Sequence, residues 1–171
     1  MSLKLLADKY IELSVKAIAE ITKDNYQNFN GIAEDYLFLY CRTGSMKIIV
    51  DDNPYELNEN DIILIRINSS YSIEKDNFST IFLAFNGSSA EDLISVMEFE
   101  NNMYHDDSHL GYYFYKIYHA YHEAEFLSIK CLGILYELFY ELTKNANVID
   151  VDYNNQQKHV EIAKEYINQN Y

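Results

Sequence analysis

The chain has 171 residues, of which 49% are hydrophobic and 15% aromatic, and its formal net charge is −14. This length and apolar content suit one folded domain with a sizeable core and argue against a disordered chain. Because Lys and Arg hold phosphate backbones, so acidic a chain is not expected to bind nucleic acid by itself. No apolar run approaches the roughly 18 residues of a membrane helix, and the first residues lack a signal-peptide pattern. With only 2 cysteines and no disulfide framework, we expect a cytoplasmic domain without membrane contact.

The first 35 residues are predicted to contain one main strand. Residues 1–10 could form a short helix or an arm. Between residues 11 and 22, apolar positions alternate with more polar ones, and a period of two is typical of a β-strand. Residues 23–35 are polar and rich in turn formers, so we expect a loop that could include one edge strand.

Residues 36–85 alternate short runs of β-branched and aromatic residues with turn clusters, about every ten residues. The turn clusters lie at 43–45, 51–54, 58–60 and 68–70. Gly44 can adopt a positive φ, and Asn and Asp tolerate the left-handed region. This rhythm predicts an antiparallel all-β sandwich or barrel.

Helical segments are predicted after residue 87. A start signature at Ser88 and Glu91 predicts a short helix that ends near Met97, and residues 101–107 are expected to form a polar loop. Two longer helices are predicted at about 109–121 and 123–144. The second carries a wide apolar stripe that must pack either on the barrel or against a second copy of the chain. The residues expected in such a dimer interface are Leu127, Cys131, Ile134, Leu138 and Leu142.

Several short motifs resemble the small cupin-like barrel of AraC-type transcription regulators. They are Tyr-Cys-Arg-Thr-Gly at 40–44, Tyr-Glu-Leu at 55–57, Asn-Asp-Ile-Ile-Leu-Ile at 60–65 and Phe-Asn-Gly at 85–87. The long helical patterns resemble the dimerisation helices of that family, and residues 159–171 resemble the first helix of its DNA-binding domain. The implied fold is mainly β with C-terminal helices (α+β): a cupin-like antiparallel β-barrel, or jelly roll, at 1–87, an antiparallel helical dimerisation segment at 88–144, a linker at 145–157 and the start of a truncated helix-turn-helix domain at 158–171.

The resemblance also implies a function. A homodimer would sense a small polar effector, with a sugar as the leading candidate, and would contact DNA only through a domain beyond Tyr171. The N-terminal segment could cover the pocket. No catalytic residue, metal or cofactor is expected. The alternative is a small metal-free cupin enzyme, such as a sugar isomerase or epimerase, which would need an acid–base pair in the barrel.

A group of aromatic and basic residues is the candidate ligand-binding set. Side chains alternate along a strand, so the even-numbered residues of 36–42 share one face. A tyrosine ring offers a stacking surface, and hydroxyl and guanidinium groups offer directional hydrogen bonds. Alternatively, the tyrosines are half-buried surface residues and the arginines lie outside the barrel, paired with carboxylates. Both faces of 36–42 and 61–67 are largely apolar, so the sequence leaves the inward face open. The set comprises Tyr36, Phe38, Tyr40, Arg42, Arg66, Tyr71 and Phe82.

The histidines argue against a metal centre inside the barrel. Residues 41–85 contain none, whereas cupin metal sites hold their ion with histidines on the strands. Two pairs outside this range, His105 with His109 and His119 with His122, have spacings that a metal could use. A polar loop and a solvated helix face carry such residues equally well.

Overall fold

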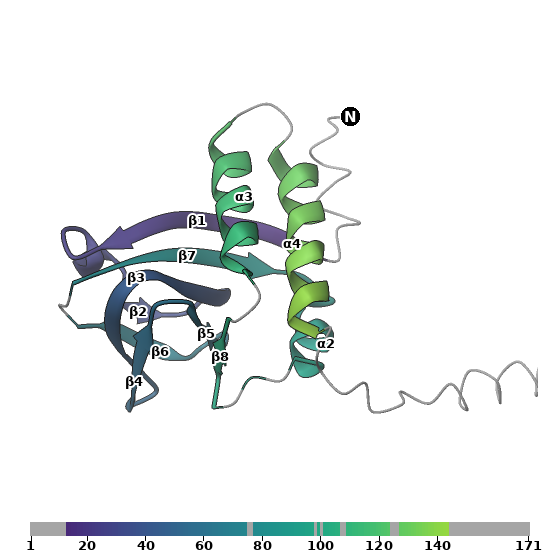
Figure 1. The fold of residues 1–171 in the computed structure, drawn as a ribbon. Helices are drawn as coiled ribbons and strands as arrows, with labels where there is room; N and C mark the ends of the chain where they lie inside the picture. Colours follow the sequence, from purple (N-terminus) through teal and green to yellow (C-terminus); the bar gives the residue numbers. More distant parts are fainter. Residues whose placement is uncertain are drawn as a thin grey trace, which may run out of the picture.

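The computed structural model describes residues 13–74, 77–97, 99, 101–106, 109–123 and 127–143. Among these residues, seven strands come first along the chain, then a short helix, then a short strand, and the two long helices come last (Figure 1). The elements are β1 (Ser14–Thr22), the 3-10 turn η1 (Tyr26–Asn28), β2 (Gly31–Ile32), β3 (Tyr36–Val50), β4 (Asn53–Asn58), β5 (Asp61–Ile65), β6 (Ser70–Ile73), β7 (Phe78–Asn86), α2 (Ala90–Ser95), β8 (Met103–His105), α3 (Gly111–His122) and α4 (Leu127–Thr143).

The long strand β3 belongs to two antiparallel sheets. Its first half lies in a sheet with the strand order β1-β7-β3-β5-β8, and its second half pairs with β4 and β6, which in turn pairs with β2. The sequence predicts a turn at 43–45, but the chain continues as one strand there. A bulge between Cys41 and Thr43 and a positive φ at Gly44 bend the strand from one sheet into the other. A side chain at Gly44 would collide with the backbone of Asn77, so only glycine fits.

A tight hairpin joins β3 to β4. Asp51 and Asp52 both have positive φ, at 48° and 65°, as a two-residue turn between twisted strands requires. Pro54 lies in β4, for which the described residues show pairing only with β3. An edge position tolerates proline because no ladder hydrogen bond is lost there.

One apolar core lies between the two sheets. It uses the inward-pointing residues of both halves of β3, and the strands on either side add aliphatic and aromatic groups. These side chains line the barrel interior. The buried contributors from β3, β5 and β7 are Leu37, Leu39, Cys41, Met46, Ile48, Val50, Ile63, Ile65, Phe78, Phe82 and Ala84.

A second apolar core lies on the opposite face of the larger sheet. The helices α3 and α4 stand side by side on this face, over β1 and β7, and α2 lies below α4 (Figure 1). Their buried residues pack against the outward-pointing side chains of β3, β5 and β7. The centre of the larger sheet is therefore buried on both faces, which explains why residues 37–41 of β3 and the strands β5 and β7 are largely apolar.

The apolar stripe of α4 belongs to this second core. Cys131, Ile134, Leu138 and Leu142 are buried within the chain itself, and Leu127 is the first residue of α4. The stripe therefore packs on the barrel, which is one of the two arrangements that the sequence leaves open. A dimer contact through α4 would have to use its opposite face.

The fold class, mainly antiparallel β-sheet followed by C-terminal helices, is confirmed. The strand expected at 11–22 is β1, the edge strand is β2, and the three expected helices are α2, α3 and α4. The expectation of a loop at 101–107 is wrong in part, because β8 forms there by pairing with β5. The N-terminal arm, the linker at 145–157 and the helix-turn-helix start at 158–171 lie outside the described residues. None of the described helices is long and apolar enough to cross a membrane.

Candidate functional site

A cleft of about 490 Å³ lies between the barrel and the first turns of α3; we call it the α3 cleft. Strand β3, the β4–β5 turn and the end of β8 form one side of it, and α3 forms the other. The α3 cleft thus bridges the barrel and the helical segment. Its lining residues are Tyr40, Asn60, His105, Asp106, His109, Gly111, Tyr112 and Tyr115.

Tyr40 anchors the barrel side of the cleft. Its ring stacks on Phe114 of α3, with centroids 5.1 Å apart and an interplanar angle of 15°. Its hydroxyl donates a hydrogen bond of 2.9 Å to Oδ1 of Asn60. Gly111 lies against the same ring, and an added Cβ would come within 2.6 Å of Cζ of Tyr40. Helix α3 therefore begins at a glycine because the tyrosine ring occupies the space of a side chain.

Asp106 gives the cleft a negative charge. The residue is only 6% exposed, and its Oδ2 accepts a hydrogen bond of 3.2 Å from the backbone N–H of Gly111. A carboxylate at this helix end is favourable because the N-terminus carries partial positive charge. Burial, and then the negative charges of Asp106 and Glu59, raise the pKa of Tyr40 to about 12. The phenol therefore stays protonated at neutral pH, and the field around it is negative.

Asp61 and His105 form a pair at the edge of the same cleft. Nδ1 of His105 lies 2.7 Å from Oδ1 of Asp61, whose Oδ2 accepts a hydrogen bond of 2.7 Å from the backbone N–H of Asn58. The aspartate is buried, whereas the histidine side chain is 61% exposed. A carboxylate held in this way orients the imidazole, which can then accept or donate a proton.

A second cleft, of about 510 Å³, lies on the other side of this pair, and we call it the β8 cleft. It runs between the edge strands β4 and β8. His105 lines both clefts. The lining residues of the β8 cleft are Pro54, Tyr55, Glu56, Asp61, Asn101, Met103, Tyr104 and His105.

The sequence-predicted ligand residues do not surround a single cavity. In the first half of β3, before the bulge, the even-numbered residues lie on the outer face of the larger sheet, so Phe38 and Tyr40 are buried under the helices rather than inside the barrel. Tyr71 and Phe82 belong to the core between the sheets. Tyr36 is half-buried and donates a hydrogen bond to Glu91. Of the whole set, only Tyr40 lines the α3 cleft.

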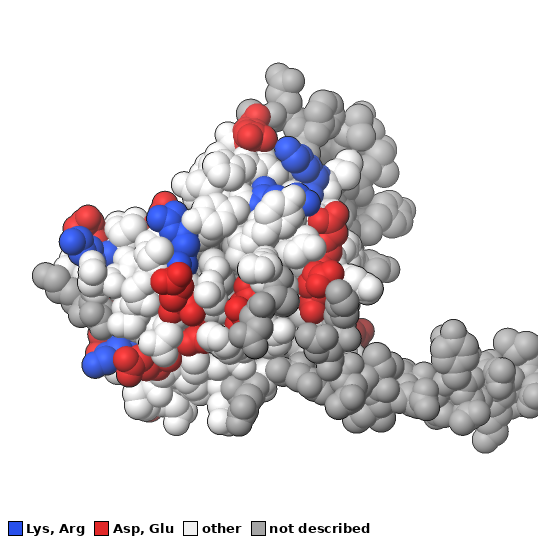
Figure 2. Space-filling view, viewed as in Figure 1, with Lys and Arg blue, Asp and Glu red and all other residues white. Residues whose placement is uncertain are grey.

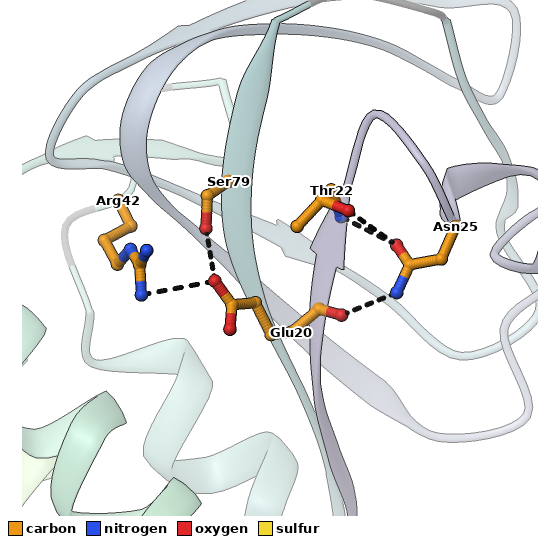
Figure 3. A network of polar contacts seen from close by, with 5 residues as sticks. All are labelled: Glu20, Thr22, Asn25, Arg42 and Ser79. Carbon is orange, nitrogen blue, oxygen red and sulfur yellow. Dashed lines mark hydrogen bonds and ion pairs between the residues drawn. The ribbon is translucent and has the colours of Figure 1, made fainter.

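Both predicted ligand-binding arginines are paired with carboxylates of the chain, as in the alternative that the sequence leaves open. Arg42 lies 3.2 Å from Oε1 of Glu20, which also accepts a hydrogen bond of 2.7 Å from the hydroxyl of Ser79 (Figure 3). Arg66 lies 2.9 Å from Oε1 of Glu91. Each guanidinium therefore already has a carboxylate partner within the chain, through one of its nitrogens.

Charged side chains are scattered over the face shown in Figure 2. Acidic and basic side chains gather in small groups on the face in Figure 2, and much of the surface between them is uncharged. On that face the blue side chains form no continuous basic patch of the kind that holds a phosphate backbone. Within the described ranges, no group of three or more His, Cys, Asp or Glu side chains is placed to hold a metal ion.

No protein-family model matches the sequence, and no curated protein sequence matches it. Solved structures resemble it in fold. ToxT from Vibrio cholerae aligns over 94% of this chain and 68% of its own, with 17% identity and a TM-score of 0.41. An RmlC-like cupin family protein from Methanocaldococcus jannaschii aligns over 49% of this chain and 78% of its own, with 17% identity and a TM-score of 0.37. A protein from Photorhabdus luminescens aligns over 46% of this chain and 61% of its own, less than two thirds, with 12% identity and a TM-score of 0.31.

The fold is cupin-like. This description rests on the topology of the chain itself, in which two antiparallel sheets share β3 around an apolar core. At this degree of similarity, no residue role is transferred from the aligned proteins.

Proposed function

We propose that this chain is the ligand-sensing and dimerisation domain of an AraC-type transcription regulator. The observation that carries the proposal is the position of the α3 cleft, which has one wall on the barrel and the other on the helical segment. The motifs at 40–44, 60–65 and 85–87 and the order of barrel, then helices, agree with that family. DNA would be contacted through a domain beyond Tyr171.

Ligand binding would act through a shift between two arrangements of the helices. A ligand in the α3 cleft touches Tyr40 and Asn60 on the barrel and the first turn of α3. Helix α3 is in turn joined to α4, since Lys116 Nζ lies 3.1 Å from Oε2 of Glu137 and the two helices bury a common face. An arrangement that places α3 better against the ligand is therefore favoured, and α4 moves with it.

Dimerisation would use the outward face of α4. Ile129, Tyr136 and Tyr140 are exposed there, and they follow one another at helical spacing. Gly133 lies on the same face with nothing within 4 Å of an added Cβ, so a partner helix can approach closely. Two such faces, related by a twofold axis, would pair as antiparallel helices.

The dimer is tested by sedimentation equilibrium of the full chain and of Ile129→Glu. The matched control is Ile32→Glu, because Ile32 on β2 is 68% exposed and Ile129 is 70% exposed. We expect a dimer for the parent chain and for Ile32→Glu, and a monomer for Ile129→Glu. In a reporter assay, the chain is fused to a DNA-binding domain that represses a reporter gene only when it is dimerised. Of the two variants, only Ile129→Glu should abolish this repression. A monomeric parent chain, or equal behaviour of the two variants, would refute this role of α4.

The second candidate function is a metal-free isomerase or epimerase, and the Asp61–His105 pair favours it. Such an enzyme moves a proton beside a carbonyl, and an imidazole oriented by a buried carboxylate suits that task. The test is deuterium uptake from D2O into a panel of aldoses and ketoses, followed by NMR. Uptake that His105→Gln abolishes and the helical variant His122→Gln retains would support an enzyme. No uptake with any sugar would refute it.

A further inference from the structure

We propose that the α3 cleft binds a small organic cation, a primary or quaternary ammonium compound, held by Asp106 and by tyrosine rings. This inference deepens the sensing function proposed above and rests on it. A volume of about 490 Å³ suits a ligand of metabolite size. The interior between the sheets is lined by buried apolar side chains, which offer such a ligand no charged partner.

The charges around the cleft favour a positive ligand. Among the described lining residues there is one carboxylate, that of Asp106, and there is neither lysine nor arginine. Burial is the main cause of the raised pKa of Tyr40, and the negative charge of Asp106 adds to it. The cations nearest the lining rings, Arg42 and Lys116, are each paired with a carboxylate of the chain, Glu20 and Glu137 respectively, so they add little net positive charge.

The aromatic lining suits the same ligand. Tyr40, Tyr112 and Tyr115 line the cleft, and the faces of such rings attract cations. The cations of the chain itself already use these rings. Lys116 Nζ lies 5.0 Å from the centroid of Tyr112, and the guanidinium carbon of Arg42 lies 5.8 Å from that of Tyr115. The positive charge of Arg42 is balanced by Glu20, so it does not reverse the field.

The ligand class also explains how binding would reach the helices. Asp106 accepts a hydrogen bond from the backbone of Gly111, the first residue of α3. A cation bound beside Asp106 would interact with the same carboxylate that accepts the hydrogen bond from the first residue of α3. It would also contact Tyr112 and Tyr115, which belong to α3. The ligand thus contacts the element that packs against α4.

The experiment is calorimetric titration of the full chain with choline, ethanolamine, putrescine and agmatine. The matched neutral probe for choline is 3,3-dimethylbutan-1-ol, which has the same shape without the charge; acetate, glucose and arabinose represent anions and sugars. We expect at least one cation to bind about tenfold more tightly than every neutral or anionic probe. No preference for a cation would overturn the proposal.

Variants locate the binding. Asp106→Asn keeps an acceptor for the Gly111 N–H but removes the charge, and it should weaken the cation about tenfold. Asp52→Asn, in the exposed β3–β4 turn, is the charge control and should leave the affinity unchanged. Tyr112→Leu should weaken binding and Tyr112→Phe should retain it. Equal affinities for Asp106→Asn and Asp52→Asn would overturn the site, with thermal denaturation verifying that each variant is folded.

The outcome separates this inference from the function on which it rests. If the chain dimerises through Ile129 and binds a sugar or an anion but no cation, the proposed ligand class is refuted and the proposed sensing function stands. A chain that binds a cation through Asp106 but stays monomeric would keep the site and refute the proposed regulator domain.

Discussion

The replacement Phe38→Ala tests whether this side chain belongs to the core or to a ligand pocket. Phe38 is fully buried on β3, with 0% exposure. The centroid of its ring lies 4.8 Å from that of Phe85, 6.3 Å from that of Phe114 and 6.0 Å from that of Phe139. These three rings come from β7, α3 and α4, so Phe38 lies where the larger sheet meets both helices.

The expected loss follows from this packing. Removing a buried phenylalanine ring costs about 3–5 kcal/mol, because apolar burial is lost and a cavity remains. For a domain of this size, the midpoint of thermal unfolding should therefore fall by roughly 6–20 °C. Urea unfolding followed by far-UV circular dichroism measures the free energy, and tyrosine fluorescence gives a second probe, since the chain has 17 Tyr and no Trp.

Two variants serve as controls. Leu39 is the next residue along β3 and points into the barrel, where it is also 0% exposed, so Leu39→Ala should cost about 2–5 kcal/mol. Ile32→Ala, at an exposed position on β2, should cost less than about 1 kcal/mol. If Phe38→Ala were as mild as Ile32→Ala and abolished ligand binding, Phe38 would be a pocket wall, and the two-sided burial of β3 would be refuted.

Further variants test the α3 cleft and the barrel. Gly111→Ala should destabilise by about 1–3 kcal/mol, because its Cβ would meet the ring of Tyr40. Gly133→Ala meets no atom of the chain itself, so in the monomeric Ile129→Glu background it should stabilise by about 1 kcal/mol in thermal denaturation. A double-mutant cycle of Tyr40→Phe and Asn60→Gly should give a coupling of about 1 kcal/mol, and strict additivity would contradict the hydrogen bond. Burial raises the pKa of Cys41 from 9.0 to about 11. Its contribution to stability is therefore complete below pH 9 and lost as the pH rises through 11, and Cys41→Val should flatten that part of the pH profile of urea unfolding.

The sequence predicts the elements of this fold better than it predicts the faces of its strands. Strands and helices are recognisable because turn residues and apolar periodicity are local signals. The inward face of β3 is not, because residues 37–41 are all buried, three of them against the other sheet and two against the helices. A strand covered on both sides has no polar face to mark the outside. Tyr36, Phe38 and Tyr40 do share one face of β3, as the alternation predicts, but that face lies under the helices and not inside the barrel.

The Asp61–His105 pair is hidden from the sequence for a different reason. The two residues are distant along the chain and become neighbours only through the antiparallel register of β5 and β8. Strand β8 spans only Met103–His105, and three residues between polar segments carry no recognisable period. The local signal of the site is Gly111 at the start of α3. The need for glycine there becomes clear only in the structure, where the ring of Tyr40 packs against it.

Asn60 explains how these distant segments are brought together in one cleft. Its φ of 72° lies in the left-handed region, which asparagine tolerates at a tight turn. From this conformation its N–H donates to the carbonyl of Cys41 at 2.8 Å, its carbonyl accepts from the N–H of Asp106 at 3.0 Å, and its side chain accepts from Tyr40. One turn residue thus ties β3 to the segment that begins α3. A ligand in the α3 cleft would contact both Tyr40 on β3 and Asp106 before α3. Binding there would therefore affect the position of α3 more directly than binding in the apolar barrel interior.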